Sequence, residues 1–268
     1  MGADTIVLAG TGLWGLCLGS FLNVCILRLP HDQSLVRPPS TCPRCHHPIA
    51  WHDNIPVVSW LLLRGRCRHC REPISIQYPL IELAVGAIWI GAVLRYGLSV
   101  HALAGALFGT ILLGIAITDA RHYLIPDEYT WGGLVIGLAL SLAGGADGFL
   151  RAVFGAATGF ALLFAVARLG QWAFKEEAMG GGDVKMMAMV GSFLGWNVGG
   201  GSNLVRAAEG VLLTVFLGAL LGSAIFVPLS IKKKRLVPFG VFLALGAAVT
   251  FVFGDAIIAW YLHFLHGE

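Results

Sequence analysis

Two aspartates far apart in the sequence stand at the ends of apolar runs, where an ionisable side chain is costly and often functional. Asp119 directly follows the apolar run 111–118, and Asp183 follows three glycines, 180–182, at the start of another run. Two carboxyl groups that share a site rarely ionise together, so one keeps its proton. The ionised group can take a proton from water while the protonated group donates to a carbonyl oxygen or a leaving amine. This pattern predicts the chemistry of an aspartic protease.

The three glycines suggest how a peptide would reach Asp183. Because glycine has no Cβ, residues 180–182 can adopt positive φ and leave room for another backbone. An extended peptide would lie beside them and pair with their amide groups, as in strand addition. Taken singly, Asp183 is equally typical of a helix cap, and Asp119 of an interfacial anchor paired with Arg121. The two acids together, at the same membrane face, favour the catalytic interpretation.

A second group of residues has the spacing of a metal site. Cys42-Pro-Arg-Cys45 and Cys67-Arg-His-Cys70 are C-x2-C pairs separated by 21 residues. Four thiolates close a tetrahedral Zn²⁺ site and leave no position for a catalytic water, so we expect structural zinc. Metal binding would stabilise the segment of about residues 30–78, which is too short to bury a sizeable core of its own.

The composition shows what surrounds these residues. Of 268 residues 57% are apolar and 12% are charged, about half the ~25% charge of a soluble domain. The net charge of +3, with basic residues flanking apolar runs, does not fit a nucleic-acid-binding protein. We therefore expect an all-α polytopic membrane protein.

We expect about eight transmembrane helices, since a span needs about 17–25 apolar residues. They cover residues 5–27, 79–95, 100–118, 129–145, 150–170, 184–198, 208–230 and 238–264. In the first span, Gly19 and Ser20 should allow close packing and Asn23 should hydrogen-bond a neighbouring helix. No sequence repeat of fixed period is expected.

The basic residues predict the orientation. Fifteen of the 18 Lys and Arg residues fall in segments 28–78, 119–128, 168–185 and 231–237, which the positive-inside rule places in the cytoplasm. Both termini are then outside, and the cluster at 232–235 anchors a span. The cysteines would lie in a reducing compartment, where disulfides do not persist. The expected division is a first transmembrane helix (1–29), a cytoplasmic zinc-binding insert (30–78) and a transmembrane core (79–268).

The order of these motifs resembles the bacterial prepilin peptidases (type IV leader peptidases) of type IV pilus and type II secretion systems. The resemblance covers nearly the whole chain and runs through residues 19–24, 28–30, both cysteine pairs, 54–56, 59–60, 78–79, 82–83, Asp119, 125–127, 179–185 and 238–240.

The resemblance implies a GxGD-type aspartic peptidase of the bacterial inner membrane with Asp119 and Asp183 as its catalytic pair. Its substrates would be prepilins or pseudopilins, whose short basic leader is removed at the cytoplasmic face. Members with the four-cysteine insert usually also methylate the new N-terminal amine with S-adenosylmethionine. The matching positions suggest two further sets of residues. Gly180, Gly182, Asp127 and Lys185 would position substrate or support the pair, and Glu82 and Gly86 are candidates for methyl transfer.

Two alternatives remain open at the level of sequence. One is a peptidase of the same fold without methyltransferase activity. The other is an ion-coupled transporter in which Asp119 and Asp183 carry protons or ions at glycine-broken helices.

Overall fold

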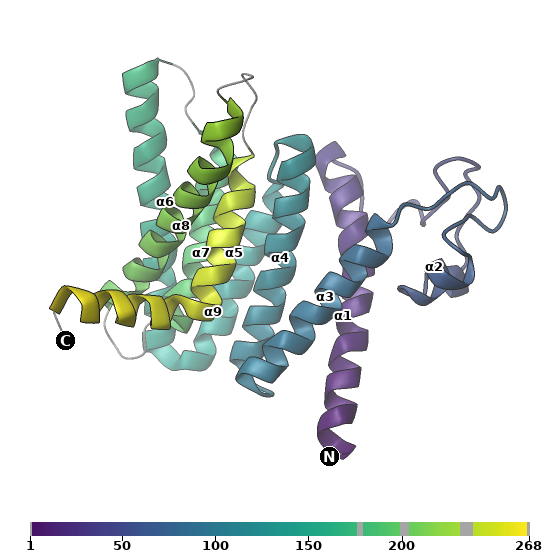
Figure 1. Ribbon diagram of the computed structural model, residues 1–268, viewed down its shortest axis with the longest axis horizontal. Coiled ribbons are helices and arrows are strands. Elements are labelled where there is room, and N and C mark those ends of the chain that lie inside the picture. The colour runs from purple at the N-terminus through teal and green to yellow at the C-terminus, as the bar shows by residue number, and fades with distance from the viewer. Residues whose placement is uncertain (1, 176–178, 199–203, 231–237, 267–268) are drawn as a thin grey trace. The chain divides into compact units, whose positions relative to one another are not determined.

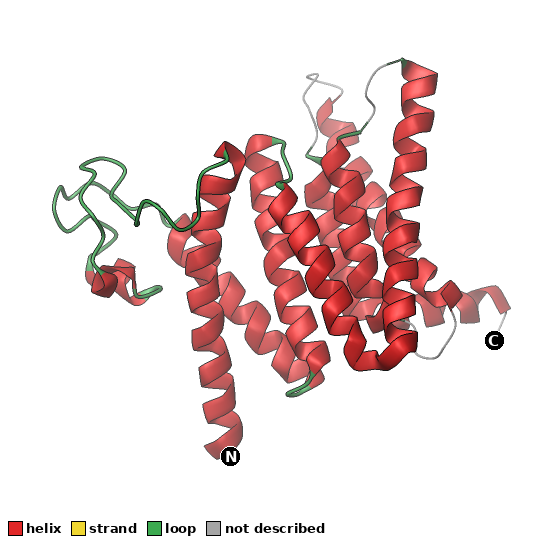
Figure 2. Ribbon diagram, turned by 180° about the vertical axis from the view of Figure 1, so that it is seen from behind, coloured by secondary structure: helices red, strands yellow, loops and turns green. Residues whose placement is uncertain are grey.

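The computed structural model describes residues 2–175, 179–198, 204–230 and 238–266. These residues form helices joined by loops, with no β-strand among them (Figure 2). The elements, in chain order, are α1 (Gly2–Arg28), η1 (Leu29–His31), η2 (Trp51–Asn54), α2 (Val58–Leu62), α3 (Gln77–Tyr96), α4 (Val100–His122), α5 (Asp127–Ser141), η3 (Leu142–Gly144), α6 (Gly145–Phe174), α7 (Gly181–Asn197), α8 (Leu204–Ser230) and α9 (Phe239–His266). The predicted all-α class is confirmed.

Long apolar helices identify the chain as a membrane protein. Within the described residues, six stretches are long and apolar enough to cross a bilayer: Asp4–His31, Gln77–Tyr96, Val100–His122, Asp127–Ala173, Leu204–Ile225 and Phe239–Phe264. The fourth contains both α5 and α6, and α7 falls outside the set. The eight predicted spans thus correspond to α1 and α3–α9 (Figure 1). The basic cluster at 232–235 lies outside the described residues.

The chain forms two compact units, Met1–Thr110 and Ile111–Glu268. The boundary between them falls within α4. The functional division at residues 29 and 78 stays a prediction.

In the first unit, α1 packs closely against α3 because glycines face the contact. A Cβ on Gly15 would lie 2.9 Å from the Cα of Gly86, and one on Gly19 would lie 2.6 Å from the Cα of Glu82. The Asn23 side-chain amide donates to the Tyr78 carbonyl at 3.1 Å. The predicted close packing at Gly19 and the interhelical hydrogen bond of Asn23 are therefore confirmed.

In the second unit, α7 is the central helix and packs against α5, α6, α8 and α9. Its residues from Val184 to Trp196 are buried, with the exception of Lys185. Backbone atoms of α6 and α7 meet at glycines spaced four residues apart: Gly155 lies against Gly191 and Gly195, and Gly159 lies against the Met187 backbone. This is the small-xxx-small pattern of close helix pairs. The 17 residues of α7 rise about 25 Å, which is less than the ~30 Å thickness of the hydrocarbon core. Burial within the bundle accommodates this short helix.

Candidate functional site

Asp119 lies in the last turn of α4, which continues to His122 beyond the predicted end at residue 118. Its side chain is buried, and its Oδ2 accepts a hydrogen bond from the Val241 backbone N–H at 3.2 Å. That amide belongs to the first turn of α9, which starts at Phe239. Because a helix N-terminus carries partial positive charge, it is a favourable neighbour for a carboxylate.

Gly240 allows this approach between α9 and α4. A Cβ at this position would lie 2.9 Å from Asp119 Oδ2 and 2.8 Å from Ile125 Cδ1. Since real Cβ atoms essentially never come this close to another atom, any larger residue would displace the carboxylate or Ile125.

Asp183 lies in the first turn of α7 and is partly buried. Its backbone N–H donates to the Gly180 carbonyl at 3.2 Å. The two acids share a neighbour, because the Ile125 side chain lies against Gly182, next to Asp183, and against Gly240, next to the Asp119 carboxylate. The fold thus brings together two acids that are 64 positions apart in the sequence.

The glycine turn before Asp183 has an ordinary backbone conformation. Gly180 is extended (φ −69°, ψ 143°), and Gly181 already belongs to α7. None of residues 180–182 has positive φ, so this turn does not use the left-handed conformation that glycine permits. The predicted space for another backbone is present at Gly181, since a Cβ on this residue would meet no atom within 4 Å. Gly182 faces the protein, where its Cβ would lie 3.1 Å from Ile125 Cβ.

Asp127 and Lys185 join the helices on either side of this site. Lys185 Nζ lies 2.8 Å from both carboxylate oxygens of Asp127. Asp127 begins α5, and Lys185 lies two positions after Asp183 in α7. The ion pair therefore ties the start of α5 to the first turn of α7.

The four cysteines of the insert form a cluster that can bind a metal ion. The Sγ atoms of Cys42, Cys45, Cys67 and Cys70 all lie within 4.8 Å of one another, and those of Cys42 and Cys70 are 3.8 Å apart. Backbone N–H groups of Cys45 and Arg44 lower the pKa of the Cys42 thiol to about 6, whereas, against the lowering effect of the Glu72 N–H, burial and the three other cysteines raise the pKa of Cys70 to about 12. A lower pKa favours the thiolate, which is the form that binds metals.

The two cysteine turns are a local repeat with an offset of 25 residues. The Cys42 N–H donates to the His47 carbonyl at 3.0 Å, and the Cys67 N–H donates to the Glu72 carbonyl at 2.8 Å. The residue after each second cysteine, His46 or Arg71, has positive φ. The expectation of no repeat therefore missed this pair. The shared pattern C-x2-C-x2-P-I at residues 42–49 and 67–74 would have revealed it.

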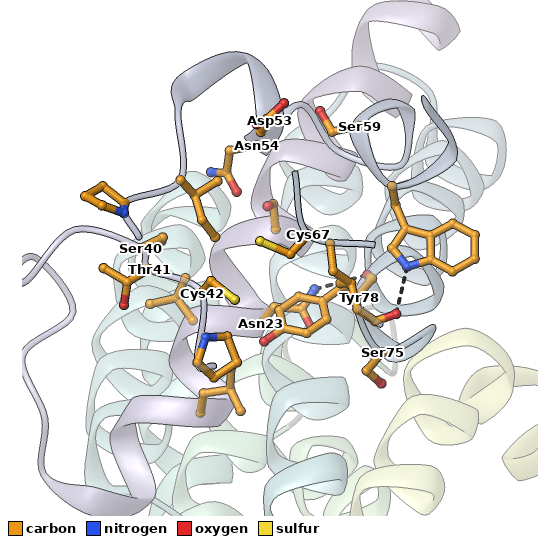
Figure 3. Close-up of a pocket in the computed structure, with 18 of the residues that line it drawn as sticks. Asn23, Ser40, Thr41, Cys42, Asp53, Asn54, Ser59, Cys67, Ser75 and Tyr78 are labelled. Atoms are coloured by element: carbon orange, nitrogen blue, oxygen red, sulfur yellow. Dashed lines mark hydrogen bonds between the residues drawn. The ribbon is translucent and has the colours of Figure 1, made fainter. Parts of the chain in front are cut away.

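A cavity of about 840 Å³ lies beside the cysteine cluster, within the first unit. Figure 3 shows Asn23 of α1, Cys42 and Cys67 of the two cysteine turns, and Tyr78 at the start of α3 around it. Its size falls within the ~300–1,000 Å³ typical of small-molecule and cofactor sites.

Glu82 is a buried acid that lines this cavity. Its Oε2 accepts a hydrogen bond from the Val57 N–H at 2.7 Å. Val57 has φ +61° and ψ −50°, a rare conformation for a β-branched residue. Glu82 therefore helps to hold a strained turn that also lines the cavity. Gly86, one helical turn further along α3, does not line the cavity and lies at the contact with α1.

Comparison with known proteins shows to which family the chain belongs. Residues 13–96 match the Bacterial Peptidase A24 N-terminal domain, and residues 106–227 match the Type IV leader peptidase family. A protein of Aeromonas hydrophila named "Prepilin leader peptidase/N-methyltransferase" is 34% identical over 93% of this chain and 92% of its own length. The chain belongs to the type IV leader peptidase family.

Other relatives of this leader peptidase carry the same name. The Bacillus subtilis protein is 31% identical over 93% of this chain and 96% of its own length. The Myxococcus xanthus protein is 43% identical over 78% of this chain, and that match spans 60% of the relative. No solved structure matches the leader peptidase chain.

Three residues around the acids of this leader peptidase were not predicted as site residues: Ile125, Gly240 and Val241. Ile125 is buried against both Gly182 and Gly240, and Val241 binds Asp119. The motifs 125–127 and 238–240 were recognised, but no sequence signal assigns them to the neighbourhood of Asp119.

Gly182 and Gly181 offer a matched test of this leader peptidase's glycine turn. We expect Gly182→Ala to reduce peptide cleavage strongly, because the new methyl group would push against Ile125 and shift the first turn of α7. Gly181→Ala adds the same methyl group into open space and should leave cleavage and thermal stability near wild type. Cleavage rates and melting temperatures of both variants in detergent check this. Equal losses in the two variants would contradict it.

Proposed function

We propose that this chain is a membrane aspartic endopeptidase that removes the leader of type IV prepilins or pseudopilins and methylates the new N-terminal residue. The observation that carries the proposal is the proximity of Asp119 and Asp183 in a chain of the leader peptidase family. Both acids lie at helix ends, at the boundary between apolar helix and loop. No metal and no nucleophilic side chain is needed for such a pair.

Cleavage requires the two carboxyl groups to share one proton. The ionised member takes a proton from the attacking water, and the protonated member donates to the carbonyl oxygen and then to the leaving amine. The amide of Val241 at the α9 N-terminus stabilises negative charge on Asp119. The coupled pair, rather than either residue alone, sets the protonation states.

The substrate would approach beside Gly180 and Gly181, where the protein leaves open space next to Asp183. In our proposal the enzyme lies in the bacterial inner membrane, with both termini outside and the acids and insert facing the cytoplasm, as the distribution of basic residues indicates. The charged leader would then stay in the cytoplasm while the apolar part of the substrate remains in the bilayer. The Asp127–Lys185 ion pair would hold α5 and α7 in register around the cleavage site.

Zn²⁺ is the metal that the cysteine cluster fits best. In a tetrahedral site with Zn–S bonds of ~2.3 Å, the sulfurs lie about 3.8 Å apart. The separation of Cys42 and Cys70 Sγ is 3.8 Å. Cys42, Cys45, Cys67 and Cys70 would hold the ion and fix the two turns that border the cavity.

We place methyl transfer in the cavity beside this cluster. S-adenosylmethionine would supply an electrophilic methyl group there when bound. The new N-terminal amine must lose a proton before it can be methylated, and Glu82 is a carboxylate placed in the cavity to attract the ammonium group and accept that proton. Gly86 would support the site only indirectly, by keeping α3 close to α1.

The charge of Glu82 can be tested separately from its hydrogen bond. Glu82→Gln keeps an acceptor for the Val57 N–H and removes the charge, so we expect methyl transfer to fall about 10- to 100-fold, since hydrogen bonds to charged groups contribute about 1.5–3 kcal/mol. Leader cleavage should not change. Glu82→Ala should also loosen the turn at Val57. Wild-type methylation by Glu82→Gln would show that this residue acts only as a structural acceptor.

The proposed function is tested by mass spectrometry of a prepilin incubated with the purified protein, with and without S-adenosylmethionine. Loss of the leader together with a gain of one methyl group supports both activities. Loss of the leader alone supports a peptidase without methyl transfer. An unchanged substrate would overturn the proposal and favour the transporter.

A further inference from the structure

Helix α2 in the insert exposes apolar side chains and buries its one polar side chain, that of Ser59. Val58, Leu61 and Leu62 share one face by their i, i+3, i+4 spacing. Leu61 is 62% exposed and Leu62 is 78% exposed. Ser59, on the other side, is buried, and its hydroxyl donates to the His52 carbonyl at 2.8 Å. This is the reverse of the pattern expected for a helix surrounded by water.

The element next to α2 also carries an exposed apolar side chain. Trp51 in η2 is 82% exposed, and η2 packs against α2. We call the set Trp51, Val58, Leu61 and Leu62 the apolar patch. None of its members lines the cavity, whereas Ser59, Trp60 and Leu63 do. The patch therefore faces away from the proposed methyl-transfer site and is not explained by it.

Basic residues border the apolar patch. Arg64 and Arg66 follow α2 and are exposed. Among the described residues no ion pair includes either of them, whereas Arg44 and Arg68 bind Glu72 and Asp53. Exposed tryptophan and leucine beside free arginines are typical of surfaces that enter the interface of an anionic bilayer.

The connections of the insert place this surface near lipid. The insert joins α1 and α3, which are both long and apolar enough to span the membrane. Figures 1 and 2 show α2 beside the body of α1 and not beyond its C-terminal end. We propose that the apolar patch inserts into the headgroup region of the bilayer that α1 and α3 cross, with Arg64 and Arg66 binding lipid phosphates. The bilayer thereby holds the insert in addition to its two chain connections and the hydrogen bond between Val57 and Glu82.

Photocrosslinking in the full-length protein tests this proposal. A diazirine-bearing phenylalanine replaces either Leu62, in the patch, or Trp60, on the opposite face of the same helix. The protein is reconstituted in nanodiscs of phosphatidylglycerol and phosphatidylcholine, irradiated, and analysed by mass spectrometry. We expect several-fold more lipid adducts at position 62 than at position 60. Adducts at position 62 to a second copy of the chain or to solvent, without lipid, would overturn the proposal.

The contribution of the Arg64 and Arg66 charges to lipid binding is measured separately. The double variant Arg64→Gln/Arg66→Gln should lower the adduct yield at position 62 in discs that contain phosphatidylglycerol. In discs of phosphatidylcholine alone, the same variant should have little effect, because no anionic headgroup is lost. An equal effect in both kinds of disc would refute phosphate binding by these arginines. The test does not depend on peptidase or methyltransferase activity, so it can fail while the proposed function stands.

Discussion

Asp119→Asn and Asp183→Asn are each expected to reduce leader cleavage at least about 10²–10⁴-fold, the usual contribution of a positioned general acid or base. The amide keeps the size of the side chain, and at Asp119 it keeps an oxygen that can accept the Val241 N–H. The loss should therefore come from the missing proton transfer and not from altered packing. Cleavage of a prepilin by each purified variant, with thermal stability measured in parallel, checks this.

The double variant sharpens the same prediction. Because the two carboxyl groups act as one unit, replacing both should cost little more than replacing one. Asp127→Asn is a suitable control, since Asp127 lies outside the pair and contacts Lys185. It should cleave far faster than either catalytic variant. Cleavage near the wild-type rate by the double variant would remove the basis of the aspartic mechanism.

Removal of the metal is expected to have the second largest effect. Structural Zn²⁺ binding contributes about 10–16 kcal/mol of folding free energy in small zinc domains, more than a short insert gains from its own core. We expect Cys67→Ser to lose bound zinc and methyl transfer, because the cysteine turns border the cavity. Leader cleavage should decline less, since Asp119 and Asp183 belong to the other compact unit.

Cys17→Ser is the matched control for this prediction. Cys17 is an exposed cysteine of α1 that is not part of the cluster, so its replacement should change neither zinc content nor methylation. Zinc analysis, mass spectrometry of the methylated product and proteolysis of residues 30–78 distinguish the two variants. Full methylation by a zinc-free enzyme would show that the cavity forms without the metal, and it would contradict the prediction.

The glycines show where reasoning from sequence alone reached its limit. The space beside Asp183 was correctly expected at Gly180 and Gly181, because the missing Cβ is a property of glycine itself, whereas Gly182 packs against Ile125. The positive φ values that glycine permits are not used, because the helix begins at Gly181. Gly86 was a methyl-transfer candidate, yet it lies at the α1–α3 contact. A side chain's identity is local, whereas its surroundings depend on the packing of other helices.

The class of the protein, the apolar spans and the four-cysteine cluster could be predicted from the residues alone, and so could the choice of the two acids as candidates, because hydropathy, C-x2-C spacing and the cost of charge in apolar runs act locally. The surroundings of these residues depend on the packing of the helices. Val241 and Gly240 reach Asp119 from about 120 residues away, α7 is enclosed by four other helices, and the cavity forms between α1, the insert and α3. These features arise from contacts between segments distant in the chain, and such contacts leave no periodic or short-range signal in the sequence.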